Sequence, residues 1–212
     1  MRWVRSPRPA WLLGLGLVLL ACSGTATPSP SGGAGPGASP GTSPSIASPP
    51  GGSTASGGLE PSGLIAVDQG LLGHLPASIG GIDVSYSGEA TAEVRNDPVL
   101  AQNASALAYG LAIDPLTGDL VVAAVVRLRP GVFNDEFYRG WRTTYDRAAC
   151  AQAGGVAGTA EATMGGRRVH IGTCNGGAHT YHVFLELPGV MISATSVGAK
   201  RFGEQLAANV RT

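Results

Sequence analysis

The chain has 212 residues with 14 basic and 14 acidic side chains, and aromatic residues make up only 6% of it. Because Arg2, Arg5 and Arg8 lie within residues 1–21, the remainder holds 11 basic and 14 acidic residues and is weakly acidic. Such a surface lacks the basic patch that nucleic-acid binding normally requires, so we expect no nucleic-acid partner.

Residues 1–21 have the features of an export signal. After the arginines, the apolar run from Trp11 to Leu20 has ten residues, which is too short to span a bilayer core of about 20 helical residues. The sequence Leu19-Leu20-Ala21-Cys22 that follows resembles the lipobox of bacterial lipoproteins, although Leu20 is less usual at its position. The alternatives are an ordinary signal peptide with an incidental cysteine, or a short membrane helix.

The lipobox resemblance implies cleavage before Cys22 and a lipid on the sulfur of that cysteine. Two or three acyl chains give stable anchoring. We therefore predict an exported protein that is bound to a membrane through lipid on Cys22. Its location is expected to be the outer face of the cytoplasmic membrane, or the periplasm or outer membrane.

Residues 22–58 form the predicted tether. Apart from Ile46, residues 23–58 are all Gly, Ser, Pro, Thr or Ala, so this segment is expected to be disordered. A plain linker is preferred over a glycosylated stalk. Residues 59–212 are then expected to form a single globular domain, a common length for one hydrophobic core.

The first half of this domain predicts alternating short elements. Residues 79–86 and 89–94 are interpreted as strands, the first with a bend or bulge at Gly80-Gly81. Asp97-Pro98 is typical of a helix start, and this short helix is expected to include Ala104 and Leu107. Residues 109–113 and 120–128 then predict two strands around a turn.

The clearest predicted helix begins after Asn134, which can cap it. Phe137, Trp141, Tyr145 and Ala149 recur every four residues and form an apolar stripe, with Phe133 just before the helix. Core packing is the preferred role for the stripe. As a hypothesis, Phe133, Phe137 and Trp141 line a site for an apolar ligand.

The second half predicts a meander and a last helix. Strands are expected at 157–163, 167–174, 179–187 and 190–197, separated by glycine-rich turns, with a helix over about 199–210. The complete order indicates an α+β fold with a mostly antiparallel sheet and helices packed on it.

The fragments Leu75-Pro76, Gly80-Gly81 and Met164 to Val169, before paired strands and a final helix, resemble the Mog1/PsbP-like α/β/α sandwiches of some bacterial lipoproteins. The resemblance implies a sandwich, with adaptor or apolar-ligand roles in a few members. No functional residue is carried over from it.

Cys150 and Cys174 are the two cysteines that remain once Cys22 is assigned to the lipid. An even pair in an exported domain predicts a disulfide; the alternative is free thiols. Pairing the strands around residues 175–178 places Cys174 opposite His179, on a face shared with Tyr181, Val183 and Leu185.

The same register places His170 opposite Val183 and His182 on the other face of the sheet. Because zinc ligands must lie about 2 Å from one ion, we predict no metal site. No nucleophile elbow, phosphate-binding loop or paired carboxylates are found, so we predict no cofactor and no catalytic residues.

We therefore expect a non-catalytic binding or adaptor module with a protein partner or ligand that the sequence does not identify. The alternatives are a carrier of an apolar ligand such as a lipid, and an unrecognised enzyme.

Overall fold

The computed structural model describes residues 65–187 and 189–212. The predicted signal peptide, the predicted lipidation site Cys22, the predicted tether and residues 59–64 of the predicted domain lie outside the described residues.

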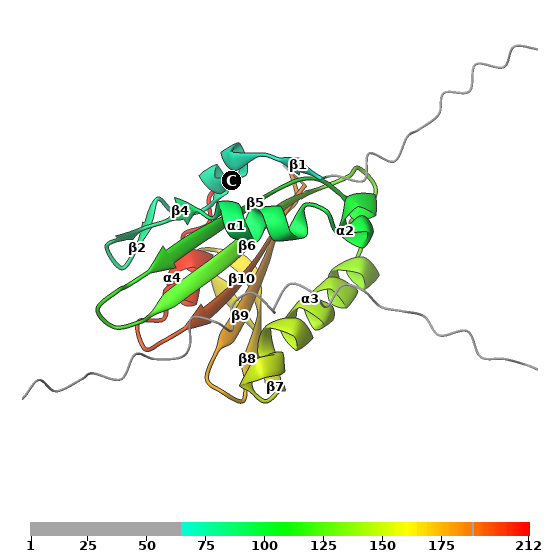
Figure 1. Cartoon of the computed structure of the whole chain (residues 1–212). Coiled ribbons are helices and arrows are strands. Elements are labelled where there is room, and N and C mark those ends of the chain that lie inside the picture. Colours follow the sequence, from blue (N-terminus) through cyan, green and yellow to red (C-terminus); the bar gives the residue numbers. More distant parts are fainter. Residues whose placement is uncertain (1–64, 188) are drawn as a thin grey trace, which may run out of the picture. The chain divides into compact units, whose positions relative to one another are not determined.

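The described residues contain one large, mostly antiparallel sheet and a separate short hairpin (Figure 1). The large sheet has the order β1-β5-β6-β10-β9-β8-β7, and β4 also pairs with β5. Its strands are β1 (Ala66–Val67), β4 (Ser85–Tyr86), β5 (Ala104–Ile113), β6 (Leu120–Leu128), β7 (Val156–Met164), β8 (Arg167–Cys174), β9 (His179–Leu185) and β10 (Val190–Val197).

Helices cover both faces of this sheet. On one face α1 (Gly88–Val94), α2 (Pro98–Asn103) and α3 (Asp135–Cys150) close a core that includes Leu107 and Met191. On the other face lie the 3-10 helix η4 (Gln69–His74), the hairpin β2–β3 and α4 (Phe202–Ala208), which close a core around Ile192. The predicted fold class, an α+β arrangement with helices on a mostly antiparallel sheet, is confirmed (Figure 1).

Two predicted strands near the start of the domain are wrong. Residues 79–86 are broken into β2 (Ser78–Ile79), β3 (Ile82–Asp83) and β4, because Gly80 and Gly81 both have positive φ and form the turn of a hairpin. Residues 89–94 belong to helix α1. The Ser87 side chain accepts a hydrogen bond from the Ala90 amide and caps this helix.

The predicted helix after Asp97 begins as expected and ends early. The Asp97 carboxylate accepts hydrogen bonds from the amides of Val99 and Leu100. Ala104 and Leu107, expected in this helix, are instead buried strand residues of β5. The turn after β5, the strand β6 and the Asn134 cap of α3 are confirmed.

The register between β8 and β9 differs by one residue from the predicted one. The loop has three residues, 175–177, because the Cys174 amide bonds to the Ala178 carbonyl and Gly177 has positive φ. His170 is therefore paired with His182 instead of Val183. The prediction that these two histidines point to opposite faces is wrong, as is the face predicted for Cys174.

Cys150 and Cys174 form the predicted disulfide. Their Cα atoms are 5.1 Å apart, and both residues are buried with Ala178 in a small cluster of their own. The bond joins the C-terminal end of α3 to the end of β8, so it fixes the helix to the sheet at one end.

Candidate functional site

A row of polar side chains crosses the sheet beneath α3. Register pairing places Ser193 of β10 beside His182 of β9, His182 beside His170 of β8, and His170 beside Glu161 of β7. Ser193 and His182 are 1% and 0% exposed, and His170 and Glu161 lie progressively closer to the sheet edge. The row therefore runs from the core to the solvent.

Three consecutive contacts from α3 cover the buried end of this row. Trp141 Nε1 donates to Ser193 Oγ at 2.9 Å, and Tyr145 donates its hydroxyl to the Ser193 carbonyl at 3.3 Å. At the next residue of the helix, Asp146 Oδ1 lies 2.8 Å from His182 Nε2, and His182 Nδ1 lies 2.9 Å from Ser193 Oγ. These bonds fix α3 to β9 and β10.

Asp146 fits against the sheet because Gly172 has no side chain. A Cβ atom at Gly172 would lie 2.8 Å from Asp146 Cγ and even closer to the Thr180 hydroxyl. Thr180 accepts from the Gly172 amide and donates to Asp146 Oδ1. The backbone of β8 therefore holds Thr180 in the position from which it bonds the carboxylate.

The Asp146 carboxyl is ionised in this arrangement. Burial alone would raise its pKa, but the hydrogen bond and charge of His182, the Thr180 hydroxyl and the nearby Arg142 together hold the pKa below its usual value. Two series of hydrogen bonds end on the Asp146 carboxylate. One runs from Trp141 through Ser193 and His182, and the other comes directly from the Thr180 hydroxyl.

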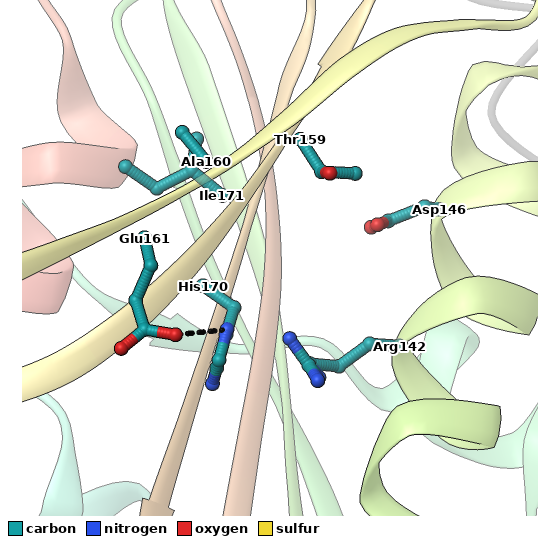
Figure 2. A pocket seen from close by; sticks show the side chains of 7 residues that line it. All are labelled: Arg142, Asp146, Thr159, Ala160, Glu161, His170 and Ile171. Carbon is teal, nitrogen blue, oxygen red and sulfur yellow. Dashed lines mark ion pairs between the residues drawn. The ribbon is translucent and has the colours of Figure 1, made fainter.

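A cavity of about 280 Å³ opens beside this network, between α3 and the β7–β8 hairpin. Figure 2 shows Arg142 and Asp146 extending from α3 toward the sheet, with His170 and Glu161 on the strands facing them. The residues that line it are Arg142, Asp146, Thr159, Ala160, Glu161, His170 and Ile171.

Arg142 and His170 are held in place around the cavity. The Arg142 guanidinium lies 4.8 Å from the centre of the Tyr138 ring, and its Nε donates to the Tyr138 carbonyl at 3.4 Å. His170 Nδ1 lies 3.3 Å from Glu161 Oε2. Partial burial and the charge of Arg142 lower the pKa of His170 despite the opposing effect of Glu161, so the neutral imidazole is favoured.

A second cavity of about 640 Å³ lies between the segment that precedes α3 and the turn that joins β9 to β10. Phe133 lines it and stacks on Phe184, with ring centroids 3.5 Å apart. Phe137 and Trp141, the other two predicted ligand-binding residues, do not line this cavity. They pack against the core on the α3 face, so the structure does not bring the three aromatic residues together in one site.

The residue types of a hydrolase triad are present in Ser193, His182 and Asp146, but a substrate cannot reach the serine hydroxyl. A nucleophilic serine must reach a substrate carbonyl. Ser193 is 1% exposed, and its Oγ receives the Trp141 indole N–H. The geometry is that of a buried structural network.

This network and the cavity could not be predicted from the sequence, because both depend on the strand register. A shift of one residue moves every side chain of a strand to the opposite face. One signal was available: Asp146 follows Tyr145 within the apolar side of α3, where an ionised residue needs a partner in the sheet.

In residues 65–187 and 189–212, no group of three or more His, Cys, Asp or Glu side chains is placed to hold a metal ion. No helix in this described part is long and apolar enough to cross a membrane. Comparisons with protein-family models, with curated proteins and with solved structures each find no match. The resemblance to Mog1/PsbP-like domains therefore stays a prediction.

Proposed function

We propose that the chain is a membrane-anchored extracytoplasmic binding module whose ligand site is the cavity between α3 and the β7–β8 hairpin. The observation that carries the proposal is the convergence of Arg142, Asp146 and His170 on one cavity. Fixed polar groups that meet in a concave site are typical of small-molecule recognition. The cavity is slightly smaller than the roughly 300–1,000 Å³ of drug-sized sites, which favours a small ligand.

A non-catalytic role is supported by the placement of the reactive groups. The hydroxyl of Ser193 and both ring nitrogens of His182 are used in buried hydrogen bonds. Cys150 and Cys174 are joined to each other. The side chains facing the cavity are suited to holding a ligand through charge and hydrogen bonds.

Equilibrium dialysis tests the binding role. The chain from residue 22 onward, with Cys22→Ser to omit the lipid, is dialysed against a metabolite extract of its host, and the enriched molecules are identified by mass spectrometry. The matched variants are Thr159→Trp, which fills the cavity, and Thr163→Trp, which places the same bulk further along β7. We expect enrichment by the parent chain and Thr163→Trp, but not by Thr159→Trp. Equal enrichment by all three, or none, would overturn the proposal.

The anchor is tested separately in the host. Cys22→Ser removes the sulfur that receives the lipid, so we expect the protein to leave the membrane fraction. Retention of the variant in washed membranes would show that another segment holds the chain there.

The second cavity favours one alternative function, that of an apolar-ligand carrier. Phe133, Phe184 and Leu128 supply apolar surface there, and Leu187 is fully exposed at its rim. In the dialysis experiment this alternative predicts enrichment of lipids that Thr159→Trp does not reduce.

A further inference from the structure

Arg142 is the cation that lines the cavity. Its Nε donates a hydrogen bond to the Tyr138 carbonyl, so the two terminal nitrogens remain to bind a ligand. In the part of the chain that the structure describes, the guanidinium forms no ion pair with a carboxylate. Because these two nitrogens form a planar fork of parallel donors, a carboxylate is the group that fits them best.

The two carboxylates that line the cavity differ in whether an oxygen atom remains free to accept a hydrogen bond from a ligand. Glu161 is paired with Arg168 at 3.2 Å and with His170 at 3.3 Å, one through each oxygen. Asp146 receives both its bonds, from Thr180 and His182, on Oδ1. Among the described residues none donates a hydrogen bond to Asp146 Oδ2, so this oxygen remains an acceptor for a ligand hydroxyl or ammonium.

Arg142 and Asp146 lie one turn apart on α3 and extend side by side into the cavity without pairing with each other (Figure 2). We propose that the ligand is a small carboxylate that carries, on the neighbouring carbon, a hydroxyl group, which makes it a monoanion, or an ammonium group, which makes it a zwitterion. Its carboxylate binds Arg142, and its donor binds Asp146 Oδ2. This inference rests on the proposed function and specifies the ligand of the same site.

The charge balance of the cavity favours this class over its neighbours. A phosphate dianion would meet one guanidinium and two carboxylates, so it would bring excess negative charge. A simple carboxylate would leave Asp146 Oδ2 desolvated and unbonded, which costs affinity. A neutral sugar has no carboxylate to form an ion pair with Arg142.

Isothermal titration calorimetry of the chain from residue 22 onward, with Cys22→Ser, tests the ligand class. The probes are lactate and alanine, which carry both groups, propionate, which lacks the donor, and inorganic phosphate. We expect lactate or alanine to bind at least about tenfold more tightly than propionate, and phosphate to bind more weakly still.

Variants of α3 identify the residue responsible. Arg142→Gln is expected to weaken lactate or alanine binding at least about tenfold. Arg142→Lys keeps the charge without the fork and is expected to give a smaller loss. Arg147→Gln is the control, because Arg147 is exposed on the same helix and does not line the cavity. Circular dichroism of each variant checks that the fold is retained.

The outcomes separate this inference from the proposed function. Tighter binding of propionate or phosphate, or full binding by a folded Arg142→Gln variant, would overturn the ligand class. If lactate and alanine fail while Thr159→Trp still abolishes enrichment of another molecule, the class is wrong and the binding role stands. If no probe and no extract component binds, both are wrong.

Discussion

His182 lies at the centre of the buried network, and its energetic role follows from its lack of solvent. It is 0% exposed, with Asp146 on one ring nitrogen and Ser193 on the other. A buried carboxylate adds little net stability when it is fully hydrogen-bonded, but removing one of its partners leaves the charge buried and less well paired. Asp146 therefore depends on His182 to remain ionised inside the fold.

Replacing His182 with alanine is expected to lower the free energy of unfolding by about 3–5 kcal/mol. The loss comes from the less well paired Asp146 carboxylate and the cavity left by the imidazole. His179→Ala is the matched control, since His179 is only half-buried in the same strand, and a change below about 1 kcal/mol is expected. Urea denaturation measures both, and equal losses would show that the network contributes nothing specific.

Asp114 titrates at an unusually low pH at the far end of β5. The Lys200 ammonium is the main cause, followed by the Leu116 amide, and together they lower the pKa of Asp114 to about 2. Because the folded pKa is below the unfolded one, this carboxylate stabilises the fold above about pH 4, and the contribution is lost as the pH falls toward 2.

Carbon-13 NMR of the Asp114 carboxyl should therefore give a midpoint near pH 2. Lys200→Gln removes the ammonium group beside Asp114, so the midpoint of the titration is expected to move up toward the ordinary aspartate value of about 3.9. An unchanged midpoint in this variant would contradict the assignment to Lys200.

At the scale of elements, α3 is attached to the sheet at several points. The disulfide fixes its C-terminal end, and hydrogen bonds to Ser193 and His182 fix its middle. Gly172 sets how closely the helix approaches β8, because Asp146 occupies the space of the missing side chain. The width of the ligand cavity depends on this approach.

Gly172→Ala is expected to destabilise the fold by about 1–3 kcal/mol, since the new methyl group overlaps Asp146 and Thr180. Gly158→Ala on the neighbouring strand is the control, because a Cβ atom there meets nothing within 4 Å. Its expected effect is within about 0.5 kcal/mol. Thermal unfolding followed by circular dichroism checks both, and a neutral Gly172→Ala would contradict the close packing of α3.

The sequence predicted these elements unevenly, for identifiable reasons. β6, α3 and β10 were predictable because a long apolar run, a capped helix and strong turns define them locally. α1 was mistaken for a strand because its seven residues show too little periodicity to distinguish the two structures. The disulfide was predictable from the number of cysteines, whereas the candidate site required the β8–β9 register, which depends on whether one loop has three or four residues.

At the scale of the whole molecule, the cavity and the start of the described chain lie on opposite edges of the sheet. The order begins with β1, which follows Ile65 directly, and ends with β7, which borders the cavity (Figure 1). The first described residues and the proposed ligand site therefore lie at different edges of the sheet.

The central claim is that the cavity beneath α3 binds a small carboxylate that carries a neighbouring hydroxyl or ammonium group. A titration of the nitrogen-15-labelled chain, from residue 22 onward with Cys22→Ser, with lactate and then alanine tests it most directly, because backbone amide shifts locate binding along the chain. We predict saturable shifts centred on Arg142, His170 and Gly172 that disappear in Thr159→Trp. Shifts centred on Phe133 and Phe184, or no saturable shift with either compound, would contradict the account.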